Sequence, residues 1–488
     1  MPTTRRVLVI DVGTSGTRAA IVGSGADVTH SVYRRTPPTT PFPGLVEFDA
    51  GALAATVVAV ARQVLVAGGP VDAIGVTCQR ASTVVWDRTT GEPVGPGLGW
   101  QDLRTVGECI MAKAEHGLAL APNQTATKAA WLLTTYDPTR SRDLCVGTID
   151  SWLVWVLTEG RYHVTDRSNA GVTGLMESGG VRWSEAALDA MHIRPEMMPH
   201  LIDSSGLIAS ATVLPGSPPI TGLAGDQQAS LIGQGCVRPG LAKCTFGTGA
   251  MLDMVTGTAA PPSADRRANG TFPIVAWTIG GEVTWGNEAI MLTAGTSVDW
   301  LVDDLGVLTS ADESDAVAGS VPDTDGVVFV PALMGLGTPR WDYGARGALL
   351  GLTRGTTRAH VVRAVLEGIA HRGADLLEAA EADSGLTVAG LRVDGGMSVN
   401  TTFVQALADA CARPIEVAPV TECTTLGAAF LAGLAAGIWP DLASIEAAWR
   451  PRRIVQPMDT GHDISRERWA EAVARSAGWI PALSALDF

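Results

Sequence analysis

The chain has 488 residues, a formal net charge of -15 and a sequence pI near 5.0. Hydrophobic residues make up 46% and charged residues 17%, which is normal for a compact globular protein and argues against disorder. Neutralising nucleic-acid phosphates requires a basic face, and no Lys/Arg cluster stands out, so nucleic acid is not expected as a partner. The length exceeds one ordinary hydrophobic core and predicts two domains.

Targeting and redox signals are weak. No run of about 18 uninterrupted apolar residues occurs, so we expect neither a membrane-spanning helix nor a membrane partner. Residues 1–6 lead directly into an apolar segment without a small-residue cleavage site, which disfavours a secretory signal. Seven scattered cysteines without a C-x-x-C pair favour reduced thiols over a disulfide framework or a zinc site. Together these features predict a cytoplasmic enzyme.

The first predicted element is a strand over Val7–Ile10, a continuous apolar run rich in β-branched residues. A polar turn follows, and apolar residues resume at Ala19–Val22, which indicates strand–turn–strand rather than strand–helix. The Ala, Val and Leu content of Asp49–Val66 predicts a helix packed on a sheet. Two further strands are predicted at 71–76 and 82–86.

The opening pattern recurs in the second half of the chain. Leu241–Phe246 and Ala250–Val255 are predicted strands on either side of Gly247-Thr248-Gly249. Two long helices and a short strand between them are predicted later, at 360–381, 400–412 and 390–393. This repetition predicts a duplicated α/β unit. Placing the boundary near residues 228–240 divides the chain into domains 1–230 and 231–488.

The turn between the first two strands has the composition of a phosphate cradle. Its glycines let the backbone approach an anion, and its N–H groups and hydroxyls supply donors. Asp11 at the strand end could hold Mg²⁺, and Arg18 could neutralise phosphate charge. Alone, the turn could equally be an ordinary hairpin. A second such turn at Thr245–Gly249 favours phosphate binding, because two facing turns would clamp a nucleotide.

Two further segments have a catalytic and a structural interpretation each. Asp226, in Gly225-Asp226-Gln227, could accept the proton of an attacking hydroxyl. By spacing alone, a cap on a helix beginning near Gln227 is the favoured interpretation. Gly396 and Asn400 could contact an adenine, although glycine needed for close helix packing explains the same pattern equally well.

The motifs occur in the order found in the FGGY family of carbohydrate kinases, which the chain resembles from about Val7 to about Gly437, most closely in its glycerol kinase branch. The resemblance is carried by Asp11-Val12-Gly13-Thr14, Gly44-Leu45-Val46-Glu47, Cys78-Gln79-Arg80, Trp100-Gln101-Asp102, Thr148-Ile149-Asp150-Ser151-Trp152-Leu153, Ala224-Gly225-Asp226-Gln227-Gln228, Phe246-Gly247-Thr248-Gly249, Gly351-Leu352-Thr353-Arg354-Gly355 and Val393-Asp394-Gly395-Gly396. It implies an α/β fold of two actin-like (ribonuclease-H-like) domains with a central ATP and substrate cleft. Homodimers or homotetramers are usual in such a family.

The resemblance also implies roles for individual residues. Asp226 becomes the expected catalytic base in place of a helix cap, and Asp11 the expected Mg²⁺ ligand. The expected ATP-binding positions are Thr14, Ser15, Arg18, Thr248, Gly295, Asp299, Gly396 and Asn400. Asp299 stands where glycerol kinases usually carry Gln. The N-terminal domain would hold the acceptor pocket and the first phosphate turn, and the C-terminal domain the second turn and the adenosine site.

The acceptor pocket departs from the glycerol kinase pattern. Its expected residues are Arg80, Ala81, Trp100, Asn123, Asp226, Gln227 and Met251. Ala81, Asn123 and Met251 replace a Glu, a Tyr and a Phe, which removes polar groups matched to glycerol and opens volume. We therefore expect a polyol or sugar of three to five carbons, with acceptors longer than glycerol preferred. The stretch Ser204–Gly222 contains no arginine, so inhibition by fructose 1,6-bisphosphate is not expected.

Three other interpretations are compatible with parts of the sequence. A ketopentose kinase of the xylulokinase type would differ only in the acceptor pocket. An actin- or chaperone-type ATPase switch would share the phosphate turns but would not need Arg80, Trp100 or the Asp226-Gln227 pair. A non-catalytic sugar sensor would have no use for Asp11 and Asp226.

Overall fold

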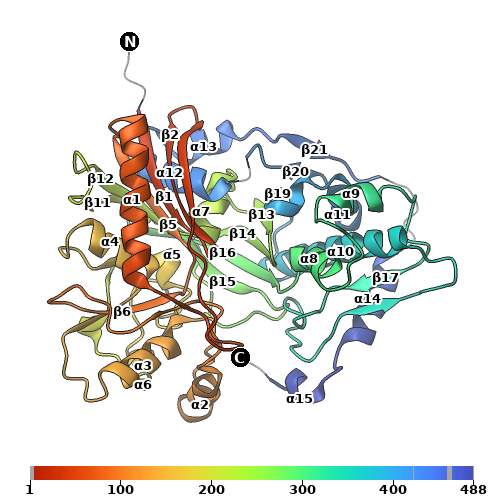
Figure 1. Cartoon of the computed structure of the whole chain (residues 1–488), viewed down its shortest axis with the longest axis horizontal. Helices are drawn as coiled ribbons and strands as arrows, with labels where there is room; N and C mark the ends of the chain where they lie inside the picture. The colour runs from red at the N-terminus through yellow and green to blue at the C-terminus, as the bar shows by residue number, and fades with distance from the viewer. Residues whose placement is uncertain (1–4, 421, 459–463, 487–488) are drawn as a thin grey trace.

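The computed structural model describes residues 5–420, 422–458 and 464–486. A 13-stranded sheet runs through both halves of the molecule in the order β21-β20-β19-β13-β14-β16-β15-β11-β12-β5-β1-β2-β3 (Figure 1). In chain order its strands are β1 (Arg6–Val12), β2 (Gly16–Gly23), β3 (Val28–Arg35), β5 (Ala73–Cys78), β11 (Ser205–Ser210), β12 (Pro219–Gly225), β13 (Ala242–Phe246), β14 (Ala250–Gly257), β15 (Phe272–Ile279), β16 (Glu282–Met291), β19 (Leu391–Asp394), β20 (Ile415–Val417) and β21 (Arg453–Val455).

Smaller sheets and the helices complete the fold. The remaining strands are β4 (Glu47–Phe48), β6 (Thr83–Asp87), β7 (Gly97–Leu98), β8 (Leu144–Thr148), β9 (Val164–Asp166), β10 (His200–Ile202), β17 (Val328–Val330) and β18 (Ala348–Leu350). The helices are α1 (Ala50–Gly68), α2 (Val106–His116), α3 (Thr125–Tyr136), α4 (Ile149–Leu157), α5 (Arg167–Ala170), α6 (Glu185–Ala190), α7 (Asp226–Gly233), α8 (Gly295–Asp303), α9 (Glu313–Ala318), α10 (Arg358–Ser384), α11 (Thr401–Cys411), α12 (Cys423–Ala435), α13 (Leu442–Ala448), α14 (Arg466–Ser476) and α15 (Pro481–Ser484).

The predicted strand–turn–strand units are confirmed, and they are the same unit used twice. The antiparallel hairpin β1–β2 pairs in parallel with β5, and the antiparallel hairpin β13–β14 pairs in parallel with β19. The predicted long helices correspond to α1, α10 and α11. Helix α7 occupies the start of the region 228–240 in which we placed the domain boundary.

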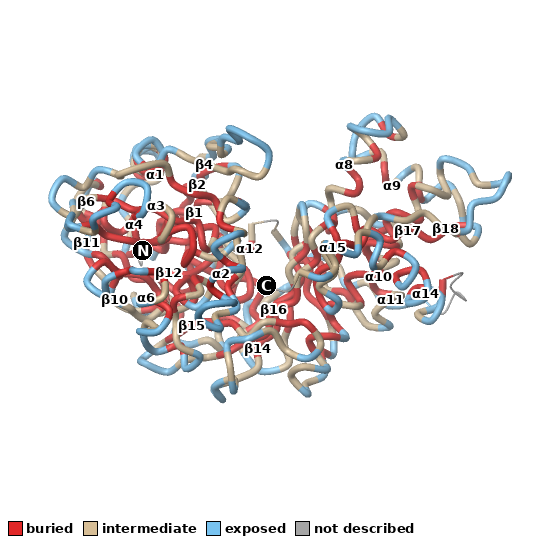
Figure 2. The backbone as a smooth tube through the Cα atoms, turned by 90° about the horizontal axis from the view of Figure 1, so that it is seen from below, coloured by how far each residue is buried: buried red, intermediate tan, exposed pale blue. Residues whose placement is uncertain are grey.

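Successive side chains of β1 point to opposite faces of the sheet and contribute to two different hydrophobic cores. Leu8 and Ile10 pack with residues of α1 and α4 on one face of the sheet, whereas Val7 and Val9 pack with α7 and α12 on the other. Figure 2 shows the resulting band of buried backbone across the N-terminal half. Helix α12 lies between β20 and β21 in sequence, yet it completes the core of the N-terminal half.

Helices α7 and α12 approach each other closely because both carry glycine at the crossing. A Cβ atom on Gly427 would lie 1.7 Å from the carbonyl oxygen of Ala229, and one on Gly233 would lie 1.9 Å from that of Cys423. Real Cβ contacts under 3.0 Å are essentially absent from proteins. The crossing therefore requires glycine, and it fixes α7, whose first residue is Asp226.

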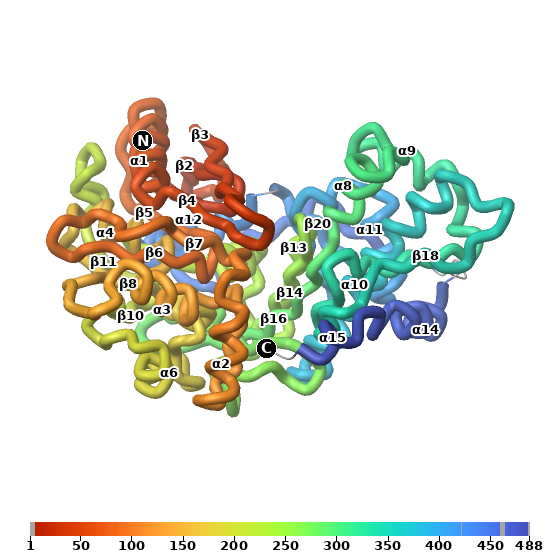
Figure 3. The backbone as a smooth tube through the Cα atoms, turned by 60° about the horizontal axis from the view of Figure 1, so that its bottom comes forward, coloured from red at the N-terminus to blue at the C-terminus, as the bar shows by residue number. Residues whose placement is uncertain are grey.

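The chain also returns to the N-terminal half at its C-terminal end. Ala485 and Leu486 line a hollow together with Cys109 and Ile110 of α2, and Figure 3 shows α2 and α15 near each other. Among the described residues, α1 alone is long and apolar enough to span a membrane by length and composition. Its buried residues, Leu53 among them, belong to the core beneath the N-terminal sheet, which is the packing of a core helix.

Candidate active site

Asp226 begins α7 where β12 ends. Gly225 is the N-cap residue, and no side chain caps this helix, so the cap interpretation of Asp226 is wrong: the helix starts one residue before the expected Gln227. The Asp226 carboxylate instead accepts a hydrogen bond from the Gln227 N–H at 2.8 Å. Burial raises the pKa of Asp226 above that of an ordinary aspartate, and the positive charge of Arg80 acts against this rise.

Residues from both halves meet at Asp226. Arg80 Nε lies 3.6 Å from Asp226 Oδ1, and Arg80 Nη2 lies 2.5 Å from Glu288 Oε2. Lys243 Nζ donates to Gln227 Oε1 at 2.6 Å and approaches the Met251 carbonyl oxygen at 3.5 Å. Four of the predicted acceptor-pocket residues are therefore brought together, with β14 and β16 of the C-terminal half opposite α7.

Two buried side chains of α3 hold the backbone at Ala81 and Asn123, two other predicted pocket residues. Thr125 Oγ1 donates to the Ala81 carbonyl oxygen at 3.2 Å, and Lys128 Nζ donates to the carbonyl oxygens of Gly99 and Asn123 at 3.0 and 3.1 Å. Burial lowers the pKa of Lys128 to about 7. Ala81 itself has a left-handed φ of +59°, a conformation that costs a residue with a Cβ about 1–2 kcal/mol.

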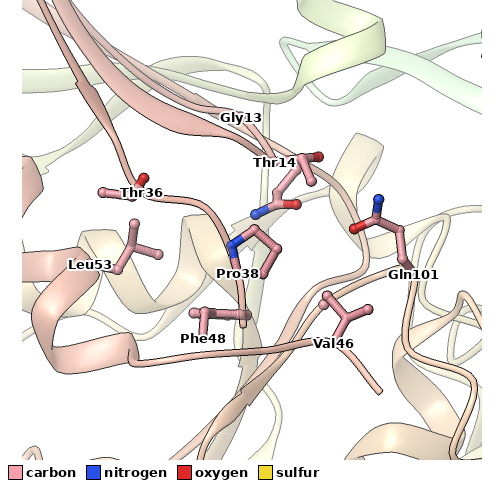
Figure 4. Close-up of a pocket in the computed structure, with 10 residues that line it drawn as sticks. Gly13, Thr14, Thr36, Pro38, Val46, Phe48, Leu53 and Gln101 are labelled. Carbon is pink, nitrogen blue, oxygen red and sulfur yellow. The ribbon is translucent and has the colours of Figure 1, made fainter. Parts of the chain in front are cut away.

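The first phosphate turn is a tight hairpin next to this group. Gly13 N donates to Gly16 O at 3.0 Å, and Trp100 Nε1 donates to Thr14 Oγ1 at 3.1 Å, which joins the turn to the acceptor side. Ser15 is exposed at the tip. Thr14 and Gln101 line one small pocket, together with Gly13, Thr36, Pro38, Val46, Phe48, Leu53, Gln79 and Gly99 (Figure 4).

The charged residues of this turn face the start of α12. Arg18 Nη2 lies 3.1 Å from Glu422 Oε1, and Thr425 Oγ1 donates to Asp11 Oδ2 at 3.4 Å. Burial and the negative charge of Asp226 raise the pKa of Asp11 to about 7. Asp11 thus carries a carboxylate whose charge is disfavoured unless a cation is near.

The second phosphate turn contacts the predicted nucleotide position Gly295 and the residue that precedes Gly396. Gly295 N donates to Gly247 O at 2.9 Å, which places the N-terminus of α8 against Gly247-Thr248-Gly249. A Cβ atom on Gly395 would lie 2.3 Å from the Phe246 carbonyl oxygen, whereas one on Gly396 would meet nothing within 4 Å. Thr248, Gly295 and Gly396 therefore gather around one edge, with open space at Gly396.

Two predicted nucleotide positions, Asn400 and Asp299, do not contact the phosphate turns through hydrogen bonds between described residues. Asn400 is the N-cap of α11: its Oδ1 accepts from Phe403 N at 2.8 Å, and its Nδ2 donates to Ser314 Oγ at 3.0 Å. Asp299 lies exposed on α8. No hydrogen bond links either residue to the phosphate turns among the described residues.

Sequence reasoning missed four charged residues at this site. Lys128, Lys243, Asp253 and Glu288 are all buried, and the last three lie on central strands. A charged residue is rarely fully buried unless it is paired. A charged residue within an apolar strand could therefore have indicated a buried ion pair.

Comparison with known proteins agrees with this arrangement. Residues 6–233 match the model of the FGGY family of carbohydrate kinases, N-terminal domain, and residues 242–436 match its C-terminal domain. A glycerol kinase from Dechloromonas aromatica is 42% identical, with 98% of each chain covered. The structure of Plasmodium falciparum glycerol kinase with ADP has a TM-score of 0.90 at 28% identity, covering 97% of this chain and 98% of that one.

A second solved structure shares the architecture. The structure described as a xyloylose kinase from Brucella ovis has a TM-score of 0.83 at 25% identity, covering 99% of this chain and 100% of that one. The expected two-domain actin-like fold is thus confirmed. The two family domains match most of the sequence, and close relatives extend over nearly its full length, so the chain belongs to the FGGY family of carbohydrate kinases and phosphorylates an alcohol group at the expense of ATP.

Proposed function

We propose that the chain transfers the γ-phosphoryl group of ATP to a hydroxyl of a small polyol, with Asp226 as general base. This role rests on the position of Asp226. The residue begins α7, its side chain is 27% exposed, and its carboxylate lies beside Arg80. The acceptor hydroxyl gives its proton to the Asp226 carboxylate as its oxygen attacks the γ-phosphorus, and ADP leaves from the opposite side.

The two phosphate turns are proposed to hold ATP from both halves. Thr14, Ser15 and Arg18 would contact the phosphates from the N-terminal half, and Thr248 and Gly295 from the C-terminal half. The positive end of the α8 helix dipole lies at Gly295 and favours an anion there. We place the adenosine near Gly396, where the structure leaves space, with Asn400 and Asp299 at the edge of that region.

Asp11 is proposed to hold the Mg²⁺ that accompanies ATP. The residues present fit such an ion: the Asp11 carboxylate has a raised pKa and a single long hydrogen bond from Thr425. The described residues contain no cluster of three metal-binding side chains, and Mg²⁺ bound with a nucleotide needs only one or two carboxylates besides phosphate and water. When bound, the ion neutralises charge on the phosphates.

The acceptor is proposed to be a polyol of three to five carbons, with four- and five-carbon polyols preferred to glycerol. Ala81 places a methyl group beside Arg80, where the glycerol kinase pattern has a carboxylate, and Asn123 and Met251 replace two aromatic rings. A site that binds hydroxyls discriminates by its polar groups, so this change alters the choice of acceptor.

A coupled ADP-release assay with ATP and Mg²⁺ across three- to six-carbon polyols and ketoses tests the proposal. We expect at least one four- or five-carbon polyol to stimulate ADP release more than glycerol does. Glycerol turnover equal to or above that of every longer polyol would refute the length preference. A ketopentose as best acceptor would favour the xylulokinase-type alternative, and ADP release that no acceptor stimulates would favour an ATPase switch.

Other properties stay predictions from the sequence. These are assembly into a homodimer or homotetramer, a cytoplasmic location, and the lack of nucleic-acid and membrane partners. Size-exclusion chromatography with light scattering measures the first directly.

A further inference from the structure

A row of four charged side chains runs from β13 across β14 and β16 to Arg80. Strand pairing places Lys243 of β13 opposite Asp253 of β14, and Asp253 opposite Glu288 of β16. Lys243 Nζ lies 2.7 Å from Asp253 Oδ2, and Glu288 Oε2 lies 2.5 Å from Arg80 Nη2. We call Lys243, Asp253, Glu288 and Arg80 the charge row.

Exposure rises steadily along this row. The side chains of Lys243 and Asp253 are 0% exposed, that of Glu288 is 6% exposed and that of Arg80 is 12% exposed. Asp226, which follows Arg80, is 27% exposed. The row therefore has an inner end inside the sheet and an outer end that opens at the proposed catalytic base, where an acceptor would arrive.

Such a row is unfavourable as a purely structural device. Asp253 and Glu288 place two carboxyls directly opposite each other on neighbouring strands, and like charges in that position destabilise a sheet. Buried ion pairs are often matched or exceeded in stability by apolar residues of similar volume. Lys243 offsets the charge of Asp253, and a side-chain hydrogen bond joins Asp253 to Glu288. Arg80 faces both Glu288 and Asp226 at the outer end.

The three nitrogens of the Arg80 guanidinium differ in their partners. Its Nε and Nη2 face Asp226 and Glu288, whereas Nη1 is buried and has no hydrogen-bond partner among the described residues. A buried donor without a partner is costly, so the ion pairs with Asp226 and Glu288 are what hold the Arg80 guanidinium in place. Ala81 has no polar side-chain atom, so Glu288 is the carboxylate that reaches the Arg80 guanidinium from the C-terminal half.

We propose that Glu288 is a specificity-determining residue of the acceptor site. It orients Arg80 and, together with Arg80, binds an acceptor hydroxyl other than the one that is phosphorylated. Asp253 and Lys243 are positioning residues that hold Glu288 on its strand. This proposal rests on the proposed polyol kinase activity and adds to it the group that selects among polyols.

The test combines an enzyme variant with altered substrates. The wild type and Glu288→Gln are assayed for ADP release with the best acceptor of the panel and with its mono-deoxy analogues, each lacking one non-reacting hydroxyl. We expect Glu288→Gln to raise the KM for the intact acceptor about tenfold, since a neutral amide replaces the charged partner of Arg80 and charge-assisted hydrogen bonds are the stronger ones. The KM for ATP should stay unchanged.

The analogues separate binding from a structural effect. For one analogue, the KM of the wild type should exceed its KM for the intact acceptor by the same factor of about ten. With that analogue, the KM of Glu288→Gln should be no higher than the KM of the wild type. Equal losses on every analogue, or an unchanged acceptor KM in Glu288→Gln, would overturn the proposal. A wild type that no polyol stimulates would instead refute the proposed function itself.

Controls come from the same strand and the same position. Glu282→Gln changes an exposed carboxylate at the start of β16 and should leave both KM values as in the wild type. If Glu288→Gln does not fold, Glu288→Asp keeps the charge but withdraws the carboxylate by one methylene. A several-fold rise in its acceptor KM at constant ATP KM supports the proposal, and an unchanged acceptor KM rejects it.

Discussion

Replacing Gly427 by Ala tests the helix crossing beneath the active site. The new methyl carbon would lie 1.7 Å from the Ala229 carbonyl oxygen, and contacts below 3.0 Å are essentially never seen. Helices α7 and α12 would therefore have to separate by more than about 1 Å, and a gap of this size forfeits a quarter to a half of each dispersion contact. Overpacking costs about 1–3 kcal/mol, and we expect the upper end because both atoms in the clash are fixed to helix backbones.

The same separation should impair catalysis. Asp226 is the first residue of α7, and a misplacement of about 1 Å in a catalytic group can lower turnover by roughly 100-fold. Urea denaturation followed by circular dichroism measures the stability, and the ADP-release assay measures kcat at a temperature where the variant is folded.

Gly107→Ala is the matched control. Gly107 also lies in a helix, α2, but a Cβ atom there would meet nothing within 4 Å. This variant should be neutral or more stable by up to about 0.5–1 kcal/mol, because alanine loses less backbone freedom on folding. A Gly427→Ala variant with the urea midpoint and kcat of the wild type would refute the crossing described above.

Four further predictions concern the reaction and its regulation. Asp226→Asn should bind ATP as the wild type does, by calorimetry, while kcat falls at least about 100-fold; near-normal turnover would remove Asp226 from the mechanism. Because burial raises the pKa of Asp226, kcat/KM should fall as the pH is lowered, through a midpoint above that of an ordinary aspartate. Arg80→Gln should move this midpoint higher still, since the Arg80 charge lowers that pKa, and a midpoint that does not move would contradict the pairing. Fructose 1,6-bisphosphate should leave the rate unchanged across a titration, and a clear inhibition curve would show a regulatory site that the segment 204–222 does not suggest.

Local patterns were enough to predict the strand–turn–strand units and the family. The apolar run Val7–Ile10 and its counterpart before Gly247 each end at a glycine turn, and these signals lie within a few residues. For Asn400, local patterns allow two interpretations. We expected a nucleotide contact, but an Asn directly before a helix is also a strong N-cap signal, and in the structure Asn400 caps α11.

The charge row could not be predicted in the same way. Lys243, Asp253 and Glu288 are up to 45 residues apart and meet only through the pairing of β13, β14 and β16. A strand slipped by one residue would send each side chain to the other face. The helix crossing at Gly427 likewise could not be predicted from the residues next to it in sequence, since its partner Ala229 lies in the other half of the chain.

The placement of α12 affects how the protein is made. Val7 and Val9 share their core with α12 as well as α7, so this face of the sheet stays partly uncovered until residues 423–435 have been synthesised. After α7 has been made, the ribosome must still add about 200 residues, which takes roughly 10–40 s at about 5–20 residues per second. The first half of the nascent chain therefore waits with an apolar surface exposed, and that interval is when it most needs the protection of a chaperone.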